Sequence, residues 1–217
     1  MKKIEQLIRG HKEFQNLHFK NFEFRFDELV LKGQSPEILF IGCSDSRVVP
    51  DLITGSQPGD LFILRNIGNF VPPFKDDNDF HGTAAAIEYA VSVLGVKHII
   101  VCGHSHCGAC ESLYKEIPKS KDLVHVRKWL ELGIVPKNFV ESNFPDKTLV
   151  EKYRLTEQIS IIYQLENLLT YPAVKRKVEE EILTIHGWYY ELQSGNIKYF
   201  DTEELEFKEL VQSKEKD

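Results

Sequence analysis

The stretch EILFIGCSDSR, residues 37–47, decides the fold class. It starts with a short continuous apolar run and ends with a cysteine, an aspartate and an arginine in close succession. A short continuous apolar run is typical of a strand that is buried on both faces of a parallel sheet. Its polar end leaves three interpretations open: a metal ligand, a thiol nucleophile, or a strand that turns into a loop.

Further runs of the same kind follow along the chain. DLFILRN (60–66) and VKHIIVCGHS (96–105) predict two more buried strands, and the alanine-rich segment 82–95 predicts a helix between them. Strand and helix therefore alternate, which predicts an α/β fold with a mainly parallel central β-sheet flanked by helices. Near the end, EEEILTIHGWYYELQSGNIKYF (179–200) predicts a late C-terminal strand pair joined by a turn at QSGN.

The remaining segments predict helices and an arm. A helix is expected to continue through CGACESLYKEI (107–117), and further helices are expected over 121–135 and 146–178, with prolines 136, 145 and 172 as breaks. Residues 1–33 predict an N-terminal helical arm that packs on a partner subunit, because they carry few apolar residues for their length. Two ordinary surface helices are the alternative. We assign 34–210 to the α/β domain and 211–217 to a loose polar tail.

Composition excludes several classes of protein. The chain has 217 residues, a formal net charge of −6 and 42% hydrophobic residues, so it is long enough to bury a core and is not a basic nucleic-acid binder. The charged N-terminus does not resemble a secretion signal, and no apolar stretch predicts a membrane span, so we expect a cytoplasmic protein with no membrane partner. Its four cysteines are therefore expected to be metal ligands, reactive groups or small core residues rather than disulfides.

Reactive side chains follow two of the predicted strands. Cys43 ends the first. His104 lies at the end of the strand at 96–105, and Cys107 follows it by three residues. Ligands bind beyond the carboxyl ends of parallel strands, so these three side chains converge if the two strands are neighbours. Two thiolates and an imidazole suit Zn²⁺, and three protein ligands leave a fourth position open for catalysis. H-x-x-C alone arises often by chance; its pairing with a second strand-end cysteine favours the metal site.

Asp45 and Arg47 lie beside the first predicted ligand. An arginine fork can hold a carboxylate in a bidentate pair, which stays ionised and can accept a hydrogen bond from a nucleophilic water. The alternative is an exposed ion pair that contributes little. Cys102 and Cys110 are extra thiols, which we interpret as small buried residues because a third or fourth thiolate would close the open site. Cys107 and Cys110 also form a C-x-x-C, so a thiol redox function stays open.

These motifs resemble the β-class carbonic anhydrases of the plant-like branch. CSDSR is followed 61 residues after its cysteine by HSHC, and 57–73, 82–91 and 185–197 resemble further family segments in the same order. The resemblance covers 34–200. It implies a zinc enzyme, with one Zn²⁺ per chain, that reversibly hydrates carbon dioxide to bicarbonate and a proton by attack of zinc-bound hydroxide on CO₂. It also implies a homodimer that can associate further into a tetramer.

The resemblance assigns roles to individual residues. It implies the zinc ligands Cys43, His104 and Cys107, and the catalytic dyad Asp45 and Arg47. It also implies the substrate-binding residues Gln34, Gly108, Phe62, Ile67 and Tyr89. The last three of these form the apolar wall of the CO₂ pocket, and the partner subunit supplies part of that wall. Ala109 departs from the usual G-H-S-x-C-G-G pattern. A second branch of the family places a tryptophan at the position of Phe40 and holds the dyad aspartate on zinc, so here we expect water at the fourth position.

Three alternatives remain open at this point. The same fold and metal could hydrolyse another linear triatomic such as CS₂ or COS. Cys43 could be the nucleophile of a redox or phosphatase-like enzyme, although its C-x-x-x-R spacing is shorter than a phosphate-binding loop needs. A zinc-stabilised binding module is the third. The segment 118–147 suggests no chemistry, and its apolar Leu123, Val126, Trp129 and Leu130 predict a helix face that is buried on the core.

Overall fold

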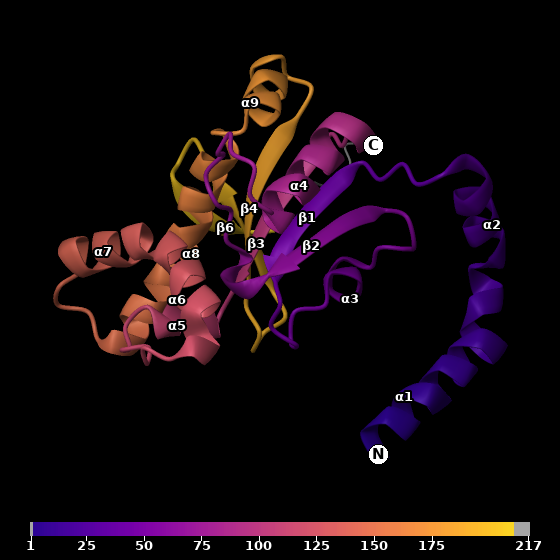
Figure 1. Ribbon diagram of the computed structural model, residues 1–217, viewed down its shortest axis with the longest axis horizontal. Coiled ribbons are helices and arrows are strands. Elements are labelled where there is room, and N and C mark those ends of the chain that lie inside the picture. Colours follow the sequence, from indigo (N-terminus) through magenta and orange to yellow (C-terminus); the bar gives the residue numbers. More distant parts are fainter. Residues whose placement is uncertain (1, 211–217) are drawn as a thin grey trace.

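A six-stranded sheet organises the chain, and the computed structural model describes residues 2–210 of it (Figure 1). The strands are β1 (Ile38–Cys43), β2 (Leu61–Asn66), β3 (His98–His104), β4 (Thr184–Tyr190), β5 (Ile197–Asp201) and β6 (Glu206–Glu209). Their order across the sheet is β2-β1-β3-β4-β5-β6; the first four are parallel, β5 is antiparallel to β4, and β6 is antiparallel to β5. The predicted fold class, a mainly parallel sheet with a late antiparallel pair, is confirmed.

Helices fill the connections between the strands. The α-helices are α1 (Lys2–Glu13), α2 (Glu23–Lys32), α3 (Pro50–Thr54), α4 (Gly82–Glu88), α5 (Gly108–Ser112), α6 (Val124–Leu130), α7 (Ile134–Asn143), α8 (Leu149–Leu168) and α9 (Pro172–Glu179). Short 3₁₀ or π turns extend several of them, including η3 (Ile67–Asn69) and η4 (Tyr89–Leu94). Within residues 2–210, no helix combines the length and the apolar character that crossing a membrane requires.

One face of the sheet is covered by helices of the same chain. Leu39 and Ile41 of β1 and Ile99 and Val101 of β3 are fully buried there against α4, η4, α8 and α9. Because side chains alternate along a strand, these four residues share one face. Burial of a large aliphatic side chain stabilises a fold by about 1.5–3 kcal/mol, so this cluster is the main core.

The opposite face of the sheet carries a smaller cluster. Phe40, Ile100 and Cys102 are buried there, and within the described residues the cluster takes in only one helical side chain, Ile53 of α3. Trp188 extends the cluster and stays partly exposed. A cavity of about 790 Å³ lies between this face and α2. Parallel sheets are normally covered on both faces, so this face lacks part of its cover within a single chain.

The first helix of the N-terminal arm lies away from the sheet. In Figure 1 the indigo α1 extends outward from the body of the molecule, and α1, α2 and the two turns between them bury no residue. The arm is helical as expected and ends at Gly33, whose φ of 79° is a conformation that glycine adopts without strain. That the arm packs on a partner remains a prediction. The predicted tail, 211–217, lies outside the described residues.

Three details differ from the expectations. β6 was missed, because EFKE is short and at the edge of the sheet, where hydrophobic alternation is weak. Pro136 does not break a helix: α7 starts at Ile134 and holds Pro136 in its first turn, where the missing N–H has no helical partner to lose. The helix predicted over 107–117 is shorter than expected, because α5 ends at Ser112.

Close packing of α8 on β3 depends on a glycine. A Cβ built at Gly103 would lie 2.8 Å from Cδ1 and Cγ1 of Ile161. We therefore expect Gly103→Ala to lower the free energy of unfolding by about 1–3 kcal/mol, the usual cost of overpacking a core. The measurement is urea denaturation at fixed protein and zinc concentration. Gly82→Ala is the matched control, because nothing lies within 4 Å of its added Cβ; equal effects of both substitutions would contradict the argument.

Candidate metal centre

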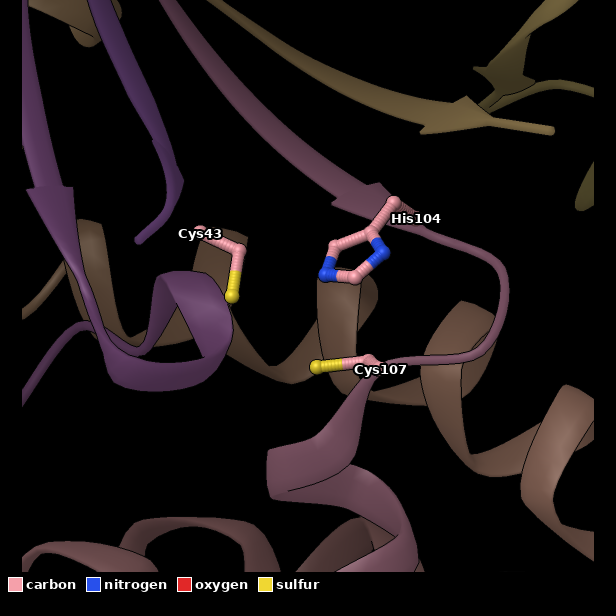
Figure 2. A group of neighbouring side chains, drawn as sticks. All are labelled: Cys43, His104 and Cys107. Carbon is pink, nitrogen blue, oxygen red and sulfur yellow. The ribbon is translucent and has the colours of Figure 1, made fainter. Parts of the chain in front are cut away.

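The register of two neighbouring strands brings the predicted ligands together. β1 and β3 are adjacent and parallel, with Gly42 paired with Cys102, so Cys43 and His104 leave the sheet at the same edge. Cys107 follows after a tight turn and caps the start of α5. In Figure 2 the two sulfur atoms and the imidazole of His104 point toward one another from these three positions.

The three side chains form a compact donor set. Cys43, His104 and Cys107 each offer a ligand atom, and these atoms lie within 4.8 Å of one another. All three residues are at least 94% buried. The backbone oxygen of Ser105 accepts a hydrogen bond from His104 Nδ1 at 2.9 Å, so in the neutral imidazole the proton lies on Nδ1 and Nε2 carries the lone pair. Nε2 is buried without a hydrogen-bond partner among the described residues, so its lone pair is free to bind a metal.

The protonation of the thiols shows what this site requires. Contact with the Cys107 thiol and burial raise the pKa of Cys43 to about 12. The pKa of Cys107 is raised too, mainly by its contact with Cys110. A thiol with a raised pKa is a poor nucleophile, which argues against Cys43 as the attacking group of a phosphatase-like enzyme. A bound cation would stabilise both sulfur atoms as thiolates, and two thiolates with one imidazole fit Zn²⁺.

The other two cysteines stand outside the donor set. Cys102 is fully buried on the sheet, and desolvation raises its pKa to about 12. Cys110 is buried in α5 beside Cys107. Neither belongs to the group whose ligand atoms lie within 4.8 Å of one another. The described residues therefore offer three protein ligands at this centre.

Asp45 and Arg47 form a bidentate pair beside the ligands. Arg47 Nε donates to Asp45 Oδ1 at 2.9 Å, Arg47 Nη2 donates to Oδ2 at 2.7 Å, and Nη2 also donates to the His106 carbonyl at 2.9 Å. These hydrogen bonds hold the pKa of Asp45 well below its usual range, so its carboxylate stays ionised. Because the pair is also tied to the second ligand loop, it is not a loose surface ion pair.

A second arginine fixes the chain that carries the dyad. Arg65 of β2 donates from Nε to the Cys43 carbonyl at 3.0 Å and from Nη2 to the Asp45 carbonyl at 2.7 Å. Both bonds hold backbone groups, so they set the direction in which the two side chains leave the loop. The sequence analysis did not identify Arg65, because no local pattern indicates that its side chain will bond to a carbonyl 22 residues earlier in the chain.

The loop between the second and third ligands is strained and strongly anchored. His106 has a φ of 58°, which is uncommon outside glycine. Ser105 N–H donates to the Tyr190 carbonyl at 2.9 Å, and Cys107 N–H donates to Glu157 Oε1 of α8 at 2.9 Å. A strained backbone conformation of this kind persists only where several surrounding contacts hold it in place.

Glu157 is the anchor that sequence reasoning missed. Its carboxyl is 2% exposed, accepts a hydrogen bond from Tyr189 Oη at 2.8 Å and lies 3.1 Å from Arg154 Nη1. Burial raises its pKa to about 7. A glutamate within a long helix looks like any exposed helix residue in sequence, and only the Glu157 contact with the Cys107 N–H gives it a role at the metal centre.

The other predicted site residues fall into two groups. Ile67 directly follows β2, whose last residue pairs with Cys43, and Gly108 directly follows Cys107, so both lie at the centre. Gln34 precedes β1 and therefore lies beyond the opposite end of this strand from Cys43, a span of roughly 16 Å for a strand of this length. Phe62 and Tyr89 contact one another with ring centroids 5.9 Å apart near the start of β2. Within one chain these three residues do not reach the metal centre.

Comparison with known proteins agrees with this geometry. The carbonic anhydrase family model matches residues 38–197. A carbonic anhydrase of Synechococcus elongatus is 38% identical over 194 residues, which is 89% of this chain and 70% of that protein. The structure of the β-carbonic anhydrase CcaA has a TM-score of 0.89 and 38% identity, and covers 94% of this chain and 98% of its own. A β-carbonic anhydrase structure from Sordaria macrospora, described as tetrameric, has a TM-score of 0.68 and 34% identity, and covers 91% of this chain and 93% of its own.

Replacing the buried anchor should be costly. Glu157→Leu leaves the Cys107 N–H, the Tyr189 hydroxyl and the Arg154 guanidinium without their partner. We expect a loss of about 3–5 kcal/mol in the free energy of unfolding, as for other broken buried pairs. Glu157→Gln keeps an oxygen for the Cys107 N–H and should lose less. Urea denaturation of both zinc-loaded variants measures this, and equal losses would show that the Cys107 contact is not what Glu157 contributes.

Proposed function

Because the chain belongs to the β-carbonic anhydrase family, we propose that Cys43, His104 and Cys107 hold its catalytic Zn²⁺ and that Asp45 and Arg47 direct the nucleophile. The enzyme catalyses CO₂ + H₂O ⇌ HCO₃⁻ + H⁺. The observation that carries the assignment is the buried Nε2 of His104, which has no hydrogen-bond partner among residues 2–210 and faces two thiols.

Each side chain has a defined part in the proposed mechanism. When bound, Zn²⁺ supplies the Lewis acidity that makes water nucleophilic near neutral pH. Asp45 is ionised and held at both oxygens by Arg47. It can therefore accept a hydrogen bond from the nucleophile, which orients a lone pair of the nucleophile toward the CO₂ carbon. Ile67 offers an apolar surface that suits uncharged CO₂. The Gly108 N–H, at the start of α5, is free of helical partners and can orient a substrate oxygen.

We propose that Asp45 stays with Arg47 and does not become a fourth protein ligand. Both of its oxygens are engaged by the guanidinium, and Arg47 itself is held by the His106 carbonyl. Phe40 packs edge-on against Trp188, with ring centroids 6.5 Å apart, at the position where the second branch of the family places a tryptophan. Both observations support the plant-like branch, in which the fourth position is open.

We also propose that the enzyme works as a homodimer that can pair into a tetramer. Ile4, Leu7 and Ile8 of α1 are more than half exposed, although they form one apolar stripe of that helix. The sheet face around Trp188 lacks cover in a single chain, so the arm of a second copy fits there. Gln34, Phe62 and Tyr89 do not reach the metal centre of their own chain and are available to the partner's centre instead.

The proposed location is the cytoplasm. All four cysteines are unpaired and buried. Free thiols, two of them proposed zinc ligands, are expected where the redox environment keeps them reduced. This proposal rests on cysteine chemistry.

The proposed roles of ligand and dyad can be separated by mutation. Cys43→Ser should lose zinc, because a hydroxyl is a poor replacement for a thiolate ligand. Asp45→Asn should keep zinc and lose about 10²–10³-fold in kcat, the usual effect of removing a preorganised polar group at the reacting atoms. Zinc content and stopped-flow CO₂ hydration provide the two measurements. Cys102→Ala is the control and should keep both, and loss of zinc in that variant would put the ligand set in doubt.

The proposed dimer can be tested on the apolar stripe of α1. Leu7→Glu places a charge where a second copy should bury a leucine, so sedimentation velocity should show a shift from dimer or tetramer toward monomer. Activity should fall with it, because Gln34, Phe62 and Tyr89 would no longer reach a partner. Gln6→Glu on the opposite side of the same helix is the matched control and should change neither. Unaltered assembly of Leu7→Glu would contradict the arm's role.

A further inference from the structure

The helices of segment 118–147 pack against the turn that follows β2. Trp129 of α6 donates from Nε1 to the Ile67 carbonyl at 2.7 Å. At the corner between α6 and α7, Gly133 packs so closely on Phe70 that an added Cβ would lie 2.9 Å from the Phe70 ring. Trp129 and Leu130 also join the hydrophobic cluster around Cys43 and Cys107. The segment therefore contacts the floor of the metal centre, although the reaction as described makes no use of it.

One peptide group connects Trp129 to a proposed zinc ligand. The Ile67 carbonyl and the Gly68 N–H belong to the same planar peptide and point in opposite directions. Trp129 donates to the carbonyl end, while the N–H end donates to Cys43 Sγ at 3.4 Å. A hydrogen bond accepted at a carbonyl polarises the N–H of the same peptide and strengthens it as a donor. The indole and the thiolate are thus coupled through two hydrogen bonds and one rigid unit.

The turn itself needs outside support. Gly68 has a φ of 77° and the next residue, Asn69, a φ of 48°. Two successive residues in the left-handed region are uncommon, and for Asn69 this conformation carries a strain cost. A Cβ at Gly68 would lie 2.9 Å from Ala109 Cβ and from the Phe70 ring, so no larger residue fits there. Without a contact at Ile67, the peptide would be free to rotate its N–H away from Cys43.

We propose that Trp129 is a positioning residue of the metal centre: it orients the Ile67–Gly68 peptide so that its N–H stays on the Cys43 thiolate. Hydrogen bonds to a metal thiolate draw charge from the sulfur and so tune the bound metal. Removing the indole N–H leaves more charge on Cys43 and makes the metal a weaker Lewis acid. The inference rests on the proposed assignment of Cys43 as a ligand.

The test uses the full-length protein loaded with Co²⁺ as a spectroscopic substitute for zinc. Trp129→Phe keeps an aromatic ring and removes the donor. Its sulfur-to-cobalt charge-transfer band should move to longer wavelength, because an electron-richer thiolate is oxidised more easily. With zinc, the acidic limb of the pH profile of kcat/KM should move to higher pH by about half a pKa unit, which is a roughly three-fold loss of rate on that limb.

Tyr163→Phe is the matched control, because it also removes a hydrogen-bonding group from an aromatic side chain, and the Tyr163 hydroxyl of α8 makes no hydrogen bond among the described residues. It should leave the band and the pH profile in place. If Trp129→Phe does not fold, benzothienylalanine at position 129 keeps the shape of the indole and replaces only its N–H. An unchanged band and pH profile in a folded, cobalt-loaded variant at position 129 would overturn the proposal. If the unsubstituted cobalt protein shows no sulfur-to-cobalt band at all, the ligand assignment fails instead.

Discussion

The parallel register between β1 and β3 is the constraint on which the rest of the centre depends. Because Gly42 pairs with Cys102, the two strands end at the same edge, and Cys43 and His104 leave the sheet together. A shift of one residue would turn every side chain of one strand to the other face. Leu39 and Ile41 would then leave the main core, so the energy that holds the register comes from burial beneath α4 and α8. The metal centre is positioned by a core that takes no part in its chemistry.

The electrostatic environment of the proposed ligands differs from that of the Asp45–Arg47 pair beside them. Contact with Cys107 raises the pKa of Cys43, contact with Cys110 raises the pKa of Cys107, and burial adds to both, so a bound metal would have to stabilise the two thiolates. Asp45 has the opposite environment, since Arg47 stabilises its charge whether or not a metal is present. The dyad is therefore preorganised by the protein, whereas metal binding completes the ligand set and releases the thiol protons.

Local patterns predicted what lies within single segments, and tertiary contacts decided the rest. The strands at β1, β2 and β3 were predictable because continuous apolar runs between turn signals have few alternative structures. Cys43, His104 and Cys107 were predictable as a set because parallel strands share an edge. Glu157, Arg65 and Trp129 were not predicted as part of the centre, because each acts through a backbone group distant in sequence, and no local pattern records such a contact. The family resemblance predicted Gln34, Phe62 and Tyr89 as substrate-binding residues. Within a single chain, however, they lie away from Cys43, His104 and Cys107.

The two cysteines proposed as ligands are supported in different ways. Cys43 Sγ accepts N–H groups from Asp45 and Gly68, each at 3.4 Å, so its charge is shared with the backbone. The N–H of Cys107 is directed instead to Glu157, which fixes the backbone of this ligand on α8. Surrounding groups thus contact the sulfur atom of Cys43 but the backbone N–H of Cys107. The sheet sets where both proposed ligands start. Of the helices around it, α6 reaches the turn beside Cys43 through Trp129, and α8 reaches Cys107 through Glu157. In this chain, substitutions in α6 and α8 are therefore expected to affect the proposed ligands one at a time, while the sheet keeps both in place.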